Sequence, residues 1–190
     1  MMPGFESDIV NCLAILRNGG TILYPTDTIW GIGCDATNEL AVEKVYRLKN
    51  RSDEKALIVL VASERDVMKY VSQPDLAVFD YLEKADRPTT VIYEGAIGLA
   101  ENLVAGDGSI AIRICKDEFC RQLINRFKKP IVSTSANISG VPAPKNFSEV
   151  SVAIKSGVDY VAQHRQNDFT QAQASSIIKW NKDGTVTVLR

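Results

Sequence analysis

Two short polar clusters, about eighty residues apart, carry the side chains best suited to bind a charged ligand. Lys49-Asn50-Arg51 follows an apolar-periodic helix pattern, and Ser133-Thr134-Ser135-Ala136-Asn137 follows the apolar pair Ile131-Val132. A lysine supplies a compact positive charge and an arginine a planar fork of donors, which suits a polyphosphate or a carboxylate. Hydroxyl and amide groups after a strand add hydrogen bonds. The clusters therefore predict a shared site for a phosphate-bearing ligand, with Lys49 and Arg51 lining solvent at a cleft.

Each cluster also has a purely structural explanation. Cations in a last helical turn favour the negative end of the helix dipole, and Asn50 suits a left-handed C-terminal position. The segment 133–137 could bond to its own backbone in a turn that Gly140 and Pro142 continue. Ligands of open α/β sheets bind beyond the carboxyl ends of strands, where this segment is expected. Both explanations stay open on the residues alone.

Two further positions have the same ambiguity. Thr26-Asp27-Thr28 follows Pro25 and is typical of a turn, yet two hydroxyls and a carboxylate after a strand could hold an amino acid. Arg113 lies in an alternating run in which Ile110, Ile112 and Ile114 share the opposite face. If its own face of the strand is exposed to solvent, Arg113 is an ordinary surface residue. If that face lines a cleft, Arg113 is a functional residue.

Familiar catalytic and nucleotide-binding motifs are missing from the sequence. Neither G-x-x-x-x-G-K-[ST] nor G-x-G-x-x-G occurs, so a bound nucleotide would need a different arrangement. His164 is the single histidine, which excludes multi-histidine zinc sites. It lies in a polar run and is predicted to be a solvated loop residue. The chemistry must therefore depend on other side chains.

The bulk composition predicts one folded cytoplasmic domain over residues 1–190. Hydrophobic residues make up 45% of the chain and charged residues 24%, which is enough apolar material for a core. The 22 Lys and Arg nearly balance the 23 Asp and Glu, so nucleic-acid binding would need a local patch. The four cysteines form no C-x-x-C pair. No signal peptide and no apolar run of about 18 residues is present, so no membrane contact is expected.

Helices and strands are expected to alternate along the chain. Helical spacing predicts helices near 7–18, 39–49, 64–70, 75–84 and 117–127, and another after Ser148. The second of these is expected to begin at a cap on Thr37 or Asn38 and to bury the apolar side chains of Leu40, Ala41, Val42, Val45 and Leu48.

The strand signals complete an α/β pattern. Short strands are predicted at 21–24, 89–93 and 110–114, and residues 30–33 are predicted to be a glycine-rich loop. The continuous apolar run 56–62 is typical of a central strand buried on both faces. A final hairpin of 176–180 and 185–189 is expected to turn at Asp183-Gly184. This alternation predicts an α/β sheet with helices packed on it.

Several of these segments together resemble a known family. They are, in chain order, Tyr24-Pro25-Thr26-Asp27-Thr28, Gly31-Ile32-Gly33, Leu48-Lys49-Asn50-Arg51, Leu57-Ile58-Val59, Ala111-Ile112-Arg113 and Ser133-Thr134-Ser135-Ala136-Asn137-Ile138-Ser139-Gly140. The combination resembles the YrdC-like family of threonylcarbamoyl-AMP synthases from about Gly19 to Arg190. The resemblance implies a twisted, mixed, open α/β sheet with flanking helices and a concave, positively charged central cavity.

The resemblance also implies an enzyme, a nucleotidyltransferase. It would join L-threonine, bicarbonate and ATP into threonylcarbamoyl-adenylate, with Mg²⁺ assisting and pyrophosphate leaving, for the N6-threonylcarbamoyladenosine modification of transfer RNA. A transfer RNA or the downstream threonylcarbamoyl-transfer proteins are then expected partners, and no metal site belonging to the protein is expected. The family pattern assigns catalysis to Lys49 and Arg51, ATP binding to Lys49, Arg51, Ser133, Ser135, Asn137 and Arg190, and threonine binding to Thr26, Arg113 and Ser175.

The sequence departs from the family pattern at three places. Segment 86–90 is Asp-Arg-Pro-Thr-Thr where the family often has Trp-Pro-Gly-Pro, segment 171–176 replaces Gly-Val-Glu-Ser-Thr, and Leu60 stands where some members have histidine. A relative with a different acceptor amino acid is therefore one alternative. Another is a non-catalytic RNA-binding or translation-associated domain with a basic strip of Lys44, Arg47, Lys49, Arg51 and Lys55.

Overall fold

A mixed open sheet organises the chain. Residues 4–50 and 57–190 are described in this computed structural model, and among them nine strands lie in the order β7-β1-β2-β6-β3-β5-β4-β8-β9. The strands are β1 Ile22–Tyr24, β2 Gly31–Gly33, β3 Ile58–Val61, β4 Thr89–Tyr93, β5 Ile110–Ile114, β6 Ile131–Ser135, β7 Tyr160–Val161, β8 Ser176–Trp180 and β9 Val186–Val188. The predicted mixed sheet is confirmed, whereas a single domain over residues 1–190 stays a prediction.

Strand β3 lies at the centre of the sheet, as its apolar run predicted. It pairs antiparallel with β6 on one side and parallel with β5 on the other. Three of its four residues are fully buried, and only Ile58 is partly accessible. Burial on both faces explains why the run lacks the polar alternation of a strand with one wet face.

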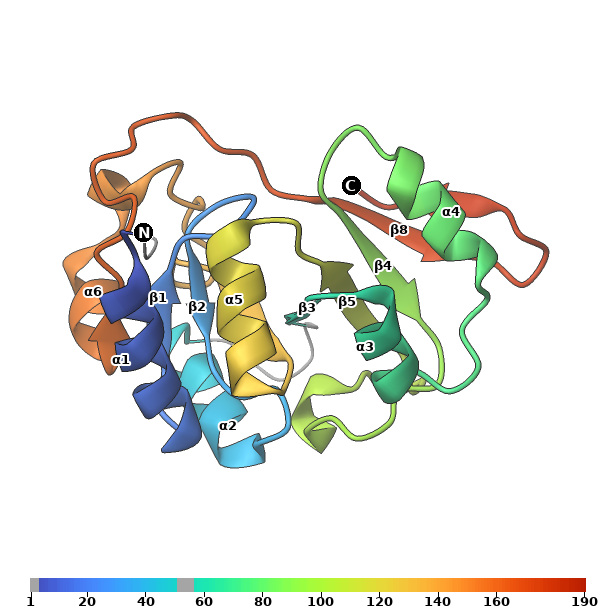
Figure 1. Ribbon diagram of the computed structural model, residues 1–190, viewed down its shortest axis with the longest axis horizontal. Helices are drawn as coiled ribbons and strands as arrows, with labels where there is room; N and C mark the ends of the chain where they lie inside the picture. The colour runs from blue at the N-terminus through green and yellow to red at the C-terminus, as the bar shows by residue number, and fades with distance from the viewer. Residues whose placement is uncertain (1–3, 51–56) are drawn as a thin grey trace.

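Helices cover the sheet on both sides (Figure 1). The α-helices are α1 Glu6–Arg17, α2 Glu39–Leu48, α3 Glu64–Tyr70, α4 Ala77–Lys84, α5 Glu118–Phe127 and α6 Val152–Gly157, with short 3₁₀ turns at Glu101–Leu103 and Phe147–Glu149. Helices α1 and α5 lie side by side over β1 and β6, and one apolar cluster joins them to these strands. A second cluster joins α2, α3 and α4 to the sheet, with residues of β1 and β6 among its members. All six helices were predicted, within a few residues.

Helix α2 follows its sequence signals at both ends. The Asn38 side chain accepts a hydrogen bond from the Ala41 N–H at 3.1 Å, and Asn50 adopts the left-handed conformation (φ 48°) beyond the helix. One detail was wrong: Leu40 is 78% exposed. The buried stripe comprises residues 41, 42, 45 and 46, so position 40 lies on the flank of the helix that faces solvent.

Residues 31–33 are a buried strand, so the predicted glycine-rich loop was wrong. A Cβ atom on Gly33 would lie 2.6 Å from a ring carbon of Tyr24 and 2.8 Å from the carbonyl oxygen of Val132. Glycine lowers strand propensity, which explains the prediction of a loop, but it also permits a close approach of neighbouring chains. Here the close packing of β1, β2 and β6 requires it.

Gly33→Ala is therefore expected to destabilise the fold by about 1–3 kcal/mol, because the added methyl overpacks a closed site. Gly106→Ala is the matched control, since a Cβ there meets nothing within 4 Å. Urea unfolding of both variants measures the difference. Equal midpoints for the two variants would show that β2 can move to accept the methyl group.

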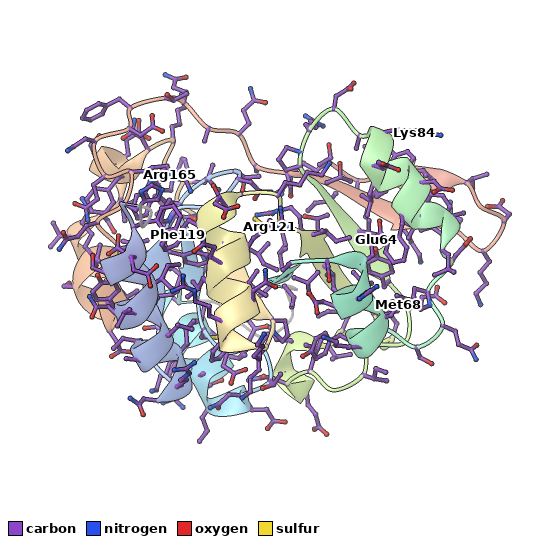
Figure 2. All side chains as sticks on the ribbon, in the orientation of Figure 1. Glu64, Met68, Lys84, Phe119, Arg121 and Arg165 are labelled. Carbon is purple, nitrogen blue, oxygen red and sulfur yellow. The ribbon has the colours of Figure 1, made fainter. Side chains whose placement is uncertain are left out.

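His164 lies in a turn, as predicted, but it is half-buried between aromatic rings and not fully solvated. Its ring centroid lies 4.9 Å from that of Phe5 and 5.5 Å from that of Phe119. Figure 2 shows Phe119 between helices α1 and α5. Burial and the charge of Arg165 lower the pKa of His164 below its usual value. The polar residues that flank His164 in the sequence concealed this packing.

This shift predicts a loss of stability in acid. Since the folded pKa of His164 lies below the unfolded value, the unfolded chain binds the proton more readily and stability falls as the pH drops through about 6.5. Replacing His164 by phenylalanine keeps an aromatic ring and removes the titration. Melting temperatures between pH 7.5 and pH 5.5 are therefore expected to fall less for this variant than for wild type. Identical pH slopes would mean that other groups carry the dependence.

The segment between β7 and β8 connects the two ends of the sheet. Figure 1 shows it crossing from the side of α6 to β8 along the upper rim of the molecule. It brings Ser175 to the beginning of β8, beside β4. In the described part of the chain, no helix has both the length and the apolar character needed to cross a membrane.

Candidate functional site

The serine cluster lies on a strand and not in a turn, which corrects the prediction for residues 133–135. Strand β6 extends through Ser135 because it has partners on both sides: Ser133 pairs with Ile58, and Ser135 pairs with Gly31. Ile58 also pairs with Ala111 of β5, so one row of side chains crosses β6, β3 and β5. Side chains alternate between the two faces along a strand, and Arg113 comes two residues after Ala111. Arg113 and the hydroxyl of Ser133 therefore lie on the same face of the sheet.

On this face, a cavity of about 300 Å³ brings together five of the residues predicted to bind ligands. They are Arg113, Ser133, Ser135, Ser175 and Arg190. The floor between them is apolar, with Ile58, Ile92, Ala111 and Ile177. An apolar hollow with a few converging polar groups is typical of a small-molecule site. The rest of the lining consists of Thr28, Ile29, Trp30, Gly31, Thr134, Ala143 and Ala174.

Lys49 connects the two polar clusters directly. Its ammonium group donates to the main-chain carbonyls of Ser135 and Asn137, the second at 2.7 Å, and the Lys49 carbonyl accepts from the Ser139 N–H at 2.8 Å. Lys49 thus lies against the second cluster, whereas the convergence of both clusters on one ligand stays a prediction. The expectation that Lys49 lines solvent was wrong, because the residue is only 1% exposed. Arg51 lies outside the described residues.

Asn137 belongs to the loop that Lys49 holds. Its side-chain amide donates to the carbonyls of Ile138 at 3.1 Å and Val141 at 2.5 Å. Its Oδ1 is buried and accepts no hydrogen bond from any described residue. A buried acceptor without a partner is rare in proteins and can be satisfied by a ligand donor. Asn137 does not line the 300 Å³ cavity itself.

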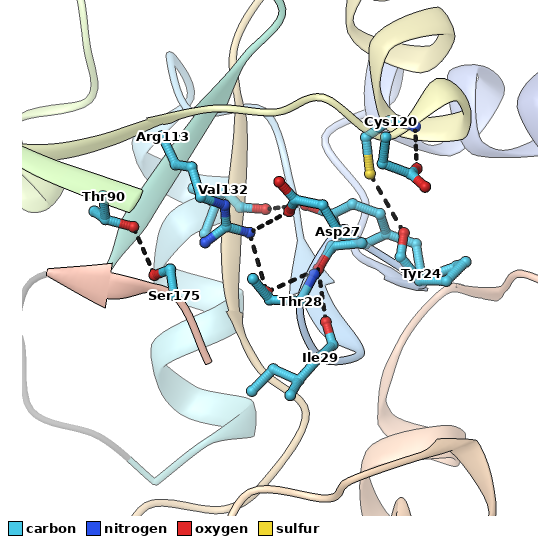
Figure 3. Close-up of polar contacts among 12 residues, drawn as sticks. Tyr24, Asp27, Thr28, Ile29, Thr90, Arg113, Cys120, Val132 and Ser175 are labelled. Carbon is cyan, nitrogen blue, oxygen red and sulfur yellow. Dashed lines mark hydrogen bonds and ion pairs between the residues drawn. The ribbon is translucent and has the colours of Figure 1, made fainter. Parts of the chain in front are cut away.

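Arg113 is a buried cation that faces the cavity (Figure 3). Its Nη2 lies 3.2 Å from Thr28 Oγ1, to which it donates, and 3.1 Å from Asp27 Oδ1. The contact with Asp27 is an ion pair without hydrogen-bond alignment, and Asp27 Oδ1 accepts no hydrogen bond from a described residue. Arg113 Nε is also buried without such a partner. Arg113 therefore has donor capacity that its described neighbours leave unused.

Thr26 and Thr28 have different surroundings in the structure, although their hydroxyl oxygens lie 3.1 Å apart. The Thr26 hydroxyl donates to the Ile29 carbonyl at 2.8 Å and accepts from the Thr28 N–H at 3.1 Å, so it holds its own loop. Thr26 lines a small neighbouring cavity of about 50 Å³, whereas Thr28 lines both this space and the larger cavity. The sequence offered both threonines as possible ligands and no sequence signal distinguishes them, whereas the family pattern assigned only Thr26.

Ser175 and Arg190 close the side of the cavity opposite Thr28. Ser175 Oγ lies 2.8 Å from Thr90 Oγ1, and Arg190 Nε donates to the Ser175 carbonyl at 3.2 Å. Burial and the nearby charge of Arg113 lower the pKa of Arg190 below its usual value. Two guanidinium groups thus face one small cavity and make it attractive to an anionic ligand.

A larger cavity of about 610 Å³ lies beyond the carboxyl ends of β3 and β5, between α3 and α4. None of the described residues to which the family pattern assigns ligand binding lines it. Segment 86–90, where the sequence departs from the family pattern, lines this larger cavity through Asp86, Arg87, Pro88 and Thr89. This departure therefore leaves the smaller cavity nearly unchanged. Asp27 also lines the larger cavity although its partner Arg113 lines the smaller one. The remaining lining residues are Ser63, Glu64, Arg65, Phe79, Leu82, Glu83, Ala85, Ile114 and Lys116.

The basic strip expected of an RNA-binding surface is interrupted. Lys49 is buried, Arg47 pairs with Glu43 at 2.8 Å, and Lys44 donates to the Gly19 carbonyl at 2.8 Å. Arg51 and Lys55 lie outside the described residues. In the described part of the chain, no three His, Cys, Asp or Glu side chains are grouped so that they could hold a metal ion.

Known proteins share this fold and sequence pattern. The chain is 36% identical to threonylcarbamoyl-AMP synthase of Psychromonas ingrahamii over 80% of this chain and 81% of that protein, and 32% identical to that of Vibrio parahaemolyticus over 94% and 99%. The crystal structure of P. abyssi Sua5 complexed with L-threonine superposes with a TM-score of 0.85 at 22% identity, a likeness of fold. It covers 97% of this chain, which spans about half (54%) of the Sua5 chain.

A family model described as "Telomere recombination" and named for Sua5, YciO and YrdC matches residues 14–190. This match includes every strand and all helices except the start of α1. The chain therefore belongs to the Sua5/YciO/YrdC family.

Proposed function

We propose that this chain is a threonylcarbamoyl-AMP synthase, which forms threonylcarbamoyl-adenylate and pyrophosphate from L-threonine, bicarbonate and ATP. The observation that carries the proposal is the 300 Å³ cavity, where Arg113 and Ser175 meet Ser133, Ser135 and Arg190. The first two are the predicted threonine ligands and the last three the predicted ATP ligands. Relatives that are 32% and 36% identical bear this name, which supports the assignment.

The reaction needs two successive bond-forming steps. The threonine amine attacks the bicarbonate carbon, and water leaves to give the carbamate. A carbamate oxygen then attacks the α-phosphorus of ATP, and the bond from this phosphorus to the leaving pyrophosphate breaks. Neither step needs a covalent protein nucleophile, because positioning and charge neutralisation supply the catalysis. A chain whose single histidine packs between Phe5 and Phe119 can perform both steps.

Arg113 is placed to bind the threonine carboxylate. A guanidinium recognises a carboxylate through paired hydrogen bonds, and its Nε is buried with no described partner. The hydroxyls of Thr28 and Ser175 lie on either side of the cavity and are suited to the amine or hydroxyl of threonine. The family pattern assigns Thr26 to the same task, although its hydroxyl bonds within the loop.

Ser133 and Ser135 are placed to bind phosphate oxygens, with Arg190 adding positive charge. Lys49 would act in part through the loop it holds, and Arg51 is proposed to contact the triphosphate as the family pattern implies. Among the described residues that line the 300 Å³ cavity, none is a carboxylate. Mg²⁺ is therefore expected to enter as the complex with ATP, held by phosphate oxygens, water and serine hydroxyls, since this ion usually keeps several waters. Bound there, it would neutralise charge on the leaving pyrophosphate.

The product is a reactive mixed anhydride and needs an acceptor. We propose that it supplies the threonylcarbamoyl group for N6-threonylcarbamoyladenosine in transfer RNA, as the resemblance implies. A transfer RNA or a threonylcarbamoyl-transfer protein would receive it.

Pyrophosphate release from ATP, with threonine and bicarbonate each omitted in turn, tests the proposal. Release is expected only with all three, and mass spectrometry of the fresh product should show threonylcarbamoyl-adenylate. Release that is indifferent to threonine would reject the specific function. Serine and other amino acids in place of threonine test for a different acceptor, and a better rate with one of them would point to a relative with altered specificity.

A further inference from the structure

Arg113 and its ion-pair partner Asp27 line two different cavities. Arg113 lines the cavity proposed for the substrates, but Asp27 lines the separate 610 Å³ cavity on the other side of the pair. The Asp27 carboxylate therefore contacts the guanidinium from the side of the 610 Å³ cavity. It does not occupy the side of Arg113 that faces the 300 Å³ cavity. Figure 3 shows Asp27 and Thr28 both converging on one end of the guanidinium.

The contacts made by Arg113 within the protein are unevenly distributed. Both described interactions use Nη2, with Asp27 Oδ1 at 3.1 Å and Thr28 Oγ1 at 3.2 Å. The Nε of this 2% exposed residue has no described hydrogen-bond partner. A guanidinium offers five N–H donors in a fixed plane, so anchoring one nitrogen orients all the others.

The loop that carries Asp27 is itself fixed on both sides. The Cys120 thiol donates to the Pro25 carbonyl at 3.3 Å, and Arg165 Nη1 donates to the Thr26 carbonyl at 3.3 Å. The Thr26 hydroxyl closes the turn by donating to the Ile29 carbonyl at 2.8 Å. Asp27 is thus held by its main chain, and its carboxylate can act as a fixed anchor.

From this geometry we propose that Asp27 is a positioning residue that selects for the α-carboxylate of the amino-acid substrate. It fixes the Arg113 guanidinium so that the remaining N–H groups meet the carboxylate in a paired arrangement. Its charge also balances that of Arg113 before the substrate arrives, which reduces the cost of keeping a buried cation. Asp27 touches no substrate and acts only through Arg113. The inference rests on the proposed function, because that function defines the substrate as an amino acid.

Asp27→Asn tests the inference, because it keeps the size of the side chain and removes its charge. Asp35→Asn is the matched control: Asp35 is a buried carboxylate that pairs with Lys129 at 2.7 Å and lines neither cavity. Calorimetric titration of the full chain measures the binding of L-threonine and of 1-aminopropan-2-ol, which is threonine without its carboxylate. Steady-state assays give the KM values for threonine and ATP.

Asp27→Asn is expected to weaken threonine binding by about tenfold or more, since a misplaced guanidinium loses its paired contacts. The KM for ATP and the binding of 1-aminopropan-2-ol should stay at wild-type values, as should the threonine affinity and both KM values of Asp35→Asn. Equal losses for threonine and 1-aminopropan-2-ol would overturn the inference, because they would reflect general damage to the loop. Unchanged threonine binding would overturn it as well.

Asp27→Glu keeps the charge on a longer side chain. Its threonine affinity is expected between those of wild type and Asp27→Asn, again with 1-aminopropan-2-ol unaffected. If the asparagine variant does not fold, this variant decides alone, and wild-type threonine affinity would then count against the inference. A wild-type chain that neither binds threonine nor uses it to release pyrophosphate would instead reject the proposed function.

Discussion

Lys49→Ala is expected to abolish threonine-dependent pyrophosphate release and also to destabilise the fold. The ammonium group is buried and donates to the carbonyls of Ser135 and Asn137. Removing it leaves both carbonyls without this donor, and each stranded group costs about 1–3 kcal/mol. The loop after β6 would then lose its tether, so the serines of the cavity would no longer be held in place. Urea unfolding and the pyrophosphate assay measure the two effects.

Arg47→Ala is the control for Lys49. It lies in the last turn of α2, two residues before Lys49, but its side chain is 78% exposed and, among the described residues, pairs only with Glu43 four residues earlier. Such surface pairs contribute about 0.3–0.5 kcal/mol, so the variant should keep nearly full stability and activity. A Lys49→Ala protein with wild-type stability and no activity would show that the lysine acts mainly on ATP. A stable and active one would contradict both roles.

Arg113→Ala is expected to lower kcat/KM for threonine by two to three orders of magnitude. Removing one partner of a buried, hydrogen-bonded charge pair typically costs about 2–5 kcal/mol, and about 1.4 kcal/mol corresponds to a factor of ten. The loss should appear mainly as a higher KM for threonine, because the guanidinium is proposed to contact the carboxylate and not the reacting atoms. Arg113→Lys should recover only part of it, since an ammonium cannot form the paired contact.

Arg121→Ala provides the comparison for Arg113, because Arg121 is an exposed cation on α5 outside the cavity. It should have wild-type KM values. A similar fall in kcat/KM for both arginine variants would mean that overall positive charge, and not the position of Arg113, draws in the substrate. A rise in the KM for ATP alone would place Arg113 at the nucleotide.

The helices and most strands could be predicted because their signals are local. The apolar spacing of α2 and α5 and the predicted cap of α2 depend on residues within a few positions, and this cap is observed at Asn38. The apolar run that forms β3 needed no knowledge of its partners, because burial on both faces removes any alternation. The order of the motifs along the chain was sufficient to indicate the family.

The errors concern features that depend on distant partners. Ser133 and Ser135 look like turn residues until β2 and β3 pair with them on both sides, and tertiary pairing then overrides their preference. The burial of Lys49 depends on carbonyls 86 and 88 residues later, which no helix-end signal contains. Likewise, Thr28 and not Thr26 faces Arg113 because of how the loop turns after Pro25.

We expect the segment between β7 and β8, residues 162–175, to make completion of the cavity a late event in folding. Ser175 meets Thr90 across 85 residues of sequence, and strand β8 pairs with β4 only after this segment has crossed the molecule. Contacts between residues so far apart form slowly because a long loop must close first. During refolding, the circular dichroism of the helices should therefore return before threonine binding does, and the delay reports the docking of β8.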